Sequence, residues 1–126
     1  MKILWLNWRC WLNPAMGGAE VFTYEVAKRW AACGHEVTLF ASKFSGCKNE
    51  ETIDGVKIVR AGGRFTVYRQ AKRFYSKRFK KEGFDVIIDE INTQPFSPFT
   101  QSRGIIGLGN CHRFRIIFRA RRFGLP

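Results

Sequence analysis

The residue types best suited to hold a ligand lie near the start of the chain, where a pair of glycines follows an apolar segment. Residues 2–6 are mostly apolar, Gly17 and Gly18 stand in the loop after them, and Glu20 follows in a run with helical spacing. Adjacent glycines at a strand-to-helix junction let the backbone approach a ligand closely, and the unpaired amides of a helix start favour an anion. We therefore predict that Gly17 and Gly18 bind a phosphate-bearing ligand, with a simple tight turn as the alternative.

Three polar residues near this junction have both a functional and a structural interpretation. Glu20 would be a neighbour of the ligand, yet an acidic residue in a first helical turn also complements the helix dipole. Asn92 and Thr93 follow the segment 84–89 and could hydrogen-bond a hydroxyl of a ligand. Both residue types are equally typical of turns.

Other kinds of site are disfavoured. Asp89 and Glu90 are adjacent acids, but strand alternation directs them to opposite faces, so they do not predict a paired acid/base system. A dinucleotide site is disfavoured because the glycines do not form Gly-x-Gly-x-x-Gly, and residues 40–43 supply no acid after the second strand. The four cysteines lack metal-ligand spacing, so we predict no metal site and interpret them as reduced thiols.

The segment 65–82 predicts a helix with a strongly basic side, because it carries many cations and no acid before Glu82. We interpret it first as a solvated helix face whose aromatic residues pack on a sheet. The second interpretation is a face for an anionic membrane surface, and nucleic acid is the least favoured. The predicted membrane-surface residues are Arg69, Lys72, Arg73, Lys77 and Lys80.

Strand and helix patterns alternate along the chain. Helical spacing predicts a helix between Gly18 and Gly34, and the polar residues 42–52 predict a loop. This alternation indicates an α/β fold with a Rossmann-like parallel sheet and flanking helices. The strand at 86–89 would then be an uncovered edge of the sheet. The predicted strands are 2–6, 37–41, 56–59 and 86–88.

Five ordered motifs resemble the N-terminal domain of family-4 glycosyltransferases with the GT-B fold. Each motif is weak alone, and their order within residues 1–100 carries the resemblance. The five are Gly17-Gly18-Ala19-Glu20, Gly34-His35-Glu36-Val37, and the segments 54–60, 84–89 and 92–96.

The resemblance implies a retaining, metal-independent, hexosyltransferase-like enzyme that moves a sugar from a nucleotide sugar to a glycan or lipid-linked acceptor. It implies no cofactor, since the nucleotide sugar is a substrate. It also implies that Gly17 and Gly18 contact the donor phosphates or the acceptor. The alternative is a small basic α/β protein that binds an anionic membrane surface or nucleic acid.

Length and charge set further expectations. The 126 residues suffice for one domain, and 45% hydrophobic residues exclude a disordered chain. We interpret residues 1–100 as a partial glycosyltransferase domain and residues 101–126, with six arginines and no acid, as a basic tail. The abrupt loss of acids is also typical of a shifted reading frame. In this interpretation the domain is truncated, and we expect no independent glycosyl transfer.

The sequence predicts neither a signal peptide nor a transmembrane helix, because its apolar runs are too short. We therefore expect a cytoplasmic protein. If the basic helix binds lipid, the expected position is peripheral, at the inner face of the membrane.

Overall fold

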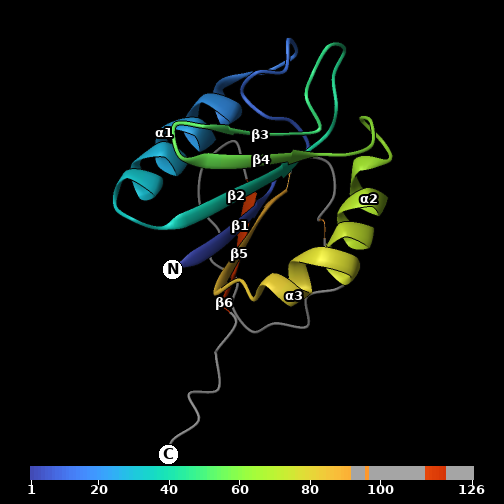
Figure 1. Ribbon diagram of the computed structural model, residues 1–126. Coiled ribbons are helices and arrows are strands. Elements are labelled where there is room, and N and C mark those ends of the chain that lie inside the picture. The colour runs from blue at the N-terminus through green and yellow to red at the C-terminus, as the bar shows by residue number, and fades with distance from the viewer. Residues whose placement is uncertain (92–95, 97–112, 119–126) are drawn as a thin grey trace, which may run out of the picture.

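The computed structural model describes residues 1–91, 96 and 113–118. Its centre is a six-stranded sheet in the order β3-β4-β2-β1-β5-β6 (Figure 1). The four inner strands run parallel to one another, while the edge strands β3 and β6 pair antiparallel with β4 and β5. The predicted α/β sheet with flanking helices is thus confirmed. The inner strands are β4 (Val56–Arg60), β2 (Glu36–Ala41), β1 (Lys2–Leu6) and β5 (Val86–Ile91), and the edges are β3 (Glu50–Ile53) and β6 (Arg113–Phe118).

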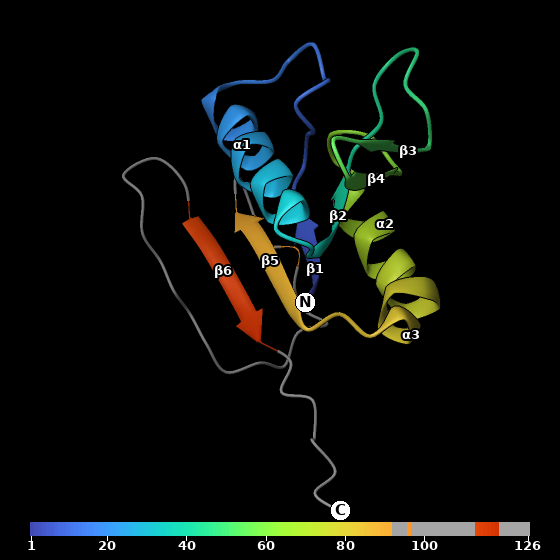
Figure 2. The same ribbon diagram turned by 60° about the vertical axis from the view of Figure 1, so that its left-hand side comes forward.

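Helices cover both faces of the sheet (Figure 2). Helix α1 (Gly18–Ala32) connects β1 to β2 and lies on one face. A helical stretch between β4 and β5 lies on the other face, and its middle part is a π-helix. Its three segments are α2 (Val67–Phe74), η1 (Tyr75–Phe79) and α3 (Lys80–Glu82).

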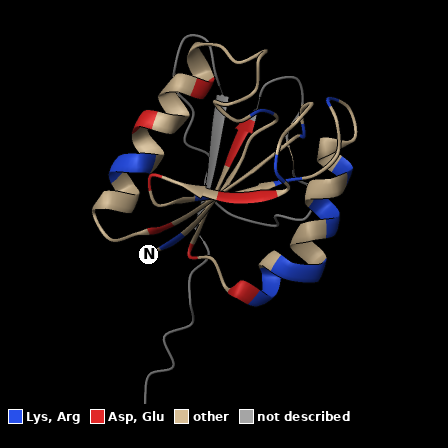
Figure 3. Ribbon diagram, turned by 45° about the horizontal axis from the view of Figure 1, so that its top comes forward, with Lys and Arg blue, Asp and Glu red and all other residues tan. Residues whose placement is uncertain are grey.

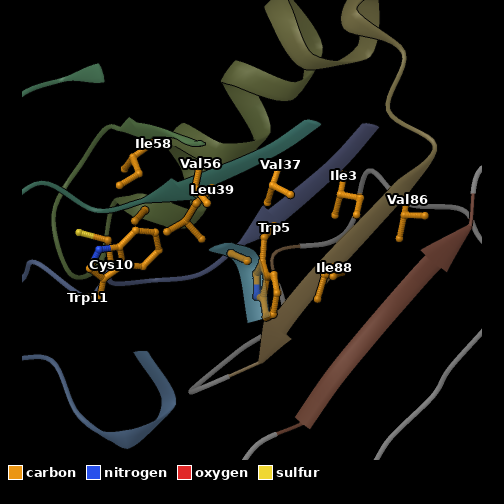
Figure 4. Close-up of a cluster of buried hydrophobic side chains, with 12 residues drawn as sticks. Ile3, Trp5, Cys10, Trp11, Val37, Leu39, Val56, Ile58, Val86 and Ile88 are labelled. Carbon is orange, nitrogen blue, oxygen red and sulfur yellow. The ribbon is translucent and has the colours of Figure 1, made fainter. Parts of the chain in front are cut away.

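Strand alternation builds two separate cores from the same strands. On the α1 face, side chains such as Ile3 and Trp5 of β1 and Val37 of β2 form one buried cluster (Figure 4). On the other face, Leu4 and Phe40 pack with residues of the α2 to α3 stretch. Because successive side chains of a strand point to opposite faces, a strand buried on both sides needs an unbroken apolar run. The predicted strands were recognisable for this reason.

The loop predicted for residues 42–52 is wrong at its end, where β3 begins at Glu50. Strand β3 pairs with β4 through a hairpin in which Ile53 opposes Val56. The two turn residues, Asp54 and Gly55, have φ values of 49° and 78°. Such left-handed conformations suit a two-residue hairpin turn, for which Asp-Gly is a strong sequence signal. That signal was present and could have located the hairpin.

The edge predicted at residues 86–89 is also corrected, because β6 covers it. Strand β6 pairs antiparallel with β5, with Val86 opposite Phe118 and Ile91 opposite Arg113. An uncovered strand edge exposes unpaired backbone groups, and this pairing removes that feature from β5. Among the described residues, no helix is both long and apolar enough to cross a bilayer.

Candidate functional site

A buried carboxylate lies where β5 ends and joins three elements of the fold. Oxygen Oε2 of Glu90 accepts hydrogen bonds from Trp5 Nε1 at 3.0 Å and from Asn7 Nδ2 at 2.8 Å. The hydroxyl of Thr23 in α1 lies 2.9 Å from the same oxygen. Glu90 and Asn7 are completely buried. The cluster therefore fixes α1 against the carboxyl ends of β1 and β5.

Burial shapes the protonation of Glu90. The pKa of this carboxyl is raised to about 7, mainly by desolvation and to a smaller extent by the negative charge of Glu20, while hydrogen bonds from Thr23 and Trp5 oppose the shift. The Thr23 hydroxyl also lies 2.9 Å from the Ala19 carbonyl oxygen. A hydroxyl has one proton to donate. When it donates to the carbonyl, a protonated Glu90 can donate to the Thr23 oxygen.

Glu20 turns back onto the start of its own helix. Its Oε2 accepts the backbone N–H of Gly17 at 2.6 Å, and its Oε1 lies 3.9 Å from Arg9 Nε. The residue is only 1% exposed. This is the reciprocal half of a capping box, which satisfies one unpaired amide of the helix start. The structural interpretation of Glu20 accounts for its position, and ligand contact by Glu20 stays a prediction.

The backbone angles at positions 17 and 18 do not require glycine. Gly17 has an extended backbone with φ of −135°, and neither it nor Gly18 is among the described residues with positive φ. A Cβ on Gly18 would meet no atom within 4 Å, and one on Gly17 would make an ordinary contact at 3.7 Å. A tight turn therefore does not explain them. Open space stands beside Gly18, where the amides of the first helical turn have no carbonyl partner within the helix.

A small basic cavity opens beside this junction, and we call it the Trp8 cavity. It has a volume of about 260 Å³, and its charged lining is entirely cationic. The Cζ of Arg9 stacks 4.2 Å from the Trp8 ring centroid, and the Cζ of Arg64 lies 5.9 Å from it. The lining residues are Trp8, Arg9, Asn13, Ala15, Ser42, Lys43 and Arg64.

A larger cavity, here called the α2 cavity, lies between β4 and the basic helical stretch. Its volume is about 560 Å³, and Lys43 lines it as well as the Trp8 cavity. Two of its arginines already face acids. Arg78 pairs with Glu50 at 2.8 Å, and the buried Arg60 lies 3.4 Å from Glu51.

The structure brings only some predicted site residues together. Gly17, Gly18 and Glu20 meet at the start of α1. Asn92 and Thr93 lie outside the described residues. Asp89 turns away from Glu90, as strand alternation predicts, and its Oδ1 accepts the backbone N–H of Phe96 at 3.1 Å.

The predicted basic face is present on the helical stretch between β4 and β5. Figure 3 shows Lys and Arg along much of this stretch, on the side of the sheet opposite α1. Phe79 and Val67 are buried against the sheet. The first interpretation, a solvated face with packed aromatics, is confirmed for Phe79, while membrane contact stays a prediction. The five predicted membrane-surface residues Arg69, Lys72, Arg73, Lys77 and Lys80 are all exposed.

Sequence reasoning missed the cluster around Glu90. Its members come from three distant segments, with Glu90 separated from Trp5 by 85 positions and from Thr23 by 67. The available signal was the adjacent acids Asp89 and Glu90 in an otherwise apolar strand, since a buried charge needs polar partners. No local pattern could name those partners.

The fold and the site define an α/β domain whose candidate ligand region lies at the carboxyl ends of its parallel strands, where open α/β sheets bind ligands. Residues 16–120 match the model of the family described as Glycosyltransferase Family 4. The chain belongs to this family, and its function is glycosyltransferase-like. No curated protein and no solved structure matched the chain. The matched range extends past residue 100, and the predicted boundary there stays a prediction.

Proposed function

We propose that this chain forms the acceptor-side domain of a retaining GT-B glycosyltransferase that uses a nucleotide-sugar donor. The observation that supports this most is the open space at Gly18, at the start of α1 and beside the carboxyl ends of the strands. The family supplies the reaction class. The proposal adds the position of the donor phosphates, against the first-turn amides of α1.

Gly17 and Gly18 have different roles in this proposal. The Gly17 N–H already donates to Glu20, so it holds the helix start in place. The amides of Gly18, Ala19 and Glu20 have no carbonyl partner within the helix, so they are the first-turn donors that remain for a phosphate. Arg9 lies 3.9 Å from the Glu20 carboxylate and offsets its charge, so that a nearby anion is less strongly repelled.

Glu90 has a positioning role in this proposal. Because it is completely buried, it does not touch a substrate at the surface. It holds Asn7, at the end of β1, and Thr23, in α1, through hydrogen bonds to a single oxygen. The glycine loop and the strand ends are thereby kept in one arrangement.

Calorimetric titration of the purified chain tests the proposal. The probes are UDP-glucose, GDP-mannose and ADP-glucose, with free glucose as the ligand that lacks phosphate. We expect at least one nucleotide sugar to bind and free glucose not to bind. Failure of all three nucleotide sugars to bind a chain that circular dichroism shows to be folded would contradict the proposal.

A second proposal concerns the basic face and is supported by Phe65. This side chain is 82% exposed, and the guanidinium of Arg64 lies 5.5 Å from its ring centroid. An exposed aromatic residue beside a row of cations is typical of a face that lies on an anionic bilayer. We propose that a cytoplasmic membrane surface is met here, while nucleic acid remains the less favoured partner.

Sedimentation with vesicles tests the second proposal. We expect binding to phosphatidylglycerol vesicles, weak binding to phosphatidylcholine vesicles, and a loss of binding when Phe65→Ala is combined with Lys77→Glu. Lys57→Glu is the matched charge control because Lys57 is exposed on β4, outside the helical stretch. Equal loss in the control, or equal binding to an oligonucleotide, would contradict a membrane-specific face.

A further inference from the structure

The Trp8 cavity gathers three cationic side chains, and two of them have no acidic partner among the described residues. Among the described residues, no carboxylate forms an ion pair with Lys43 or Arg64, both of which are exposed at the cavity. Arg9 lies near one described carboxylate, that of Glu20, at the long distance of 3.9 Å. Like charges gathered at one concavity repel one another, and a bound anion relieves that repulsion.

The indole of Trp8 adds an oriented platform to these cations. The guanidinium of Arg9 stacks on its ring and that of Arg64 lies near it, which places both cations beside one aromatic surface. The indole Nε1 is buried and has no hydrogen-bond acceptor among the described residues. Because this nitrogen is buried, Trp8 offers a ligand its ring surface rather than a hydrogen-bond donor.

The lining residues also place the cavity beside the loop that precedes α1. Ala15 and Asn13 line it, and they belong to the loop that leads into the start of α1. Ser42 and Lys43, which line its other side, follow the carboxyl end of β2. It therefore adjoins the proposed position of the donor phosphates and is lined by different side chains.

We propose that the Trp8 cavity binds the phosphate group of the acceptor, so that this glycosyltransferase acts on a phosphorylated acceptor. The inference rests on the proposed function and specifies its acceptor. Lys43 and Arg64 contact the phosphate oxygens, and the Trp8 ring packs against the adjoining sugar or glycerol carbons. Arg9 holds the Trp8 ring in place, since it is already committed to Glu20 and to the carbonyl of Ala15.

The α2 cavity is the competing position for an anion, and it is less suited. Arg60 and Arg78 are partly neutralised there by Glu51 and Glu50, and Glu50 itself lines that cavity. Lys43 belongs to both cavities. Variants at Arg64 and Lys77 separate them, because Arg64 lines only the Trp8 cavity and Lys77 only the α2 cavity.

Titration with glucose 6-phosphate, with free glucose and inorganic phosphate as partial ligands, tests the inference on the full chain. We expect glucose 6-phosphate to bind, and Arg64→Ala and Lys43→Ala each to weaken it about tenfold, the effect typical of a lost charge-assisted hydrogen bond. Lys77→Ala and Lys57→Ala should leave its affinity unchanged. Unchanged affinity in Arg64→Ala, or an equal loss in Lys57→Ala, would overturn the inference.

Two further arms identify the source of the phosphate and separate this inference from the proposed function. If soluble glucose 6-phosphate fails to bind but phosphatidylglycerol vesicles bind, and Arg64→Ala and Lys43→Ala weaken that binding more than Lys77→Ala does, the phosphate belongs to a lipid and the inference holds. If neither phosphate source binds in an Arg64-dependent way while a nucleotide sugar still binds, the inference fails alone. If no nucleotide sugar binds either, the proposed function fails with it.

Discussion

The side-chain amide of Asn7 donates a hydrogen bond to Glu90, with Nδ2 2.8 Å from Oε2. This contact joins the residue after β1 to the end of β5, two neighbouring parallel strands. Trp5 and Thr23 also form hydrogen bonds with this carboxylate oxygen. One buried group therefore holds together the carboxyl ends of the strands, where we place the ligand.

Glu90 makes the stability of the fold depend on pH. Its pKa is raised to about 7 from the ordinary value of 4.5, so the folded state binds a proton more tightly than the unfolded state. The stabilisation is fully present below about pH 4.5 and is lost as pH rises through about 7. Glu90→Gln removes this loss, and we expect it to be more stable than the parent at pH 8.5 by up to about 3 kcal/mol.

Urea unfolding at pH 5 and pH 8.5 measures this difference. Glu36→Gln is the matched control, because the Glu36 side chain is 72% exposed. A variant at position 90 that is equally destabilised at both pH values would show that the charge of Glu90 does not set the dependence.

The Thr23 hydroxyl should contribute measurably to the stability of the fold. Thr23→Val keeps the shape but removes the group that contacts Glu90 and the Ala19 carbonyl. We expect a loss of about 1–3 kcal/mol in the free energy of unfolding, because a buried carboxylate loses a partner. Thr52→Val, at an exposed position of β3, should change stability little. Equal effects in urea unfolding would contradict the role of Thr23.

The Asp54-Gly55 turn offers a test of the hairpin. Gly55 has φ of 78°, and a Cβ there would stand 3.2 Å from the Cβ of Ala31 in α1. Gly55→Ala therefore adds crowding to backbone strain, and we expect a loss of about 1–2 kcal/mol. Gly46→Ala shares a φ of 80° but meets no atom within 4 Å. Thermal unfolding should give Gly55→Ala a lower melting temperature than Gly46→Ala. The reverse order would contradict the packing of this turn on α1.

The parallel sheet was predictable because strands buried on both faces must be apolar throughout, as residues 3–6 and 86–88 are. The glycine at the end of α1 was predictable for a similar reason, since Gly34 has φ of 92°. The pairing of β6 with β5 was not, because Arg113 and Arg115 interrupt the apolar pattern expected of a strand.

The candidate site was only half predictable. Gly17 and Gly18 could be found because a glycine pair at a strand-to-helix junction is a local pattern. The Trp8 cavity could not, since Arg64 and Lys43 approach Trp8 only after β2 and β4 have taken their places in the sheet. Contacts between distant segments depend on the whole fold.

The most direct test of the proposed function compares folding and ligand binding in Gly18→Ala. Because the added Cβ meets no atom of the protein within 4 Å, stability should stay the same or rise by up to about 1 kcal/mol. The same methyl group would occupy the space of the donor phosphate, so nucleotide-sugar affinity should fall at least about tenfold. Gly63→Ala, at a glycine without positive φ whose Cβ would make only an ordinary contact at 3.8 Å, should change neither quantity. Unchanged nucleotide-sugar affinity in a stable Gly18→Ala protein would contradict a phosphate site at the start of α1.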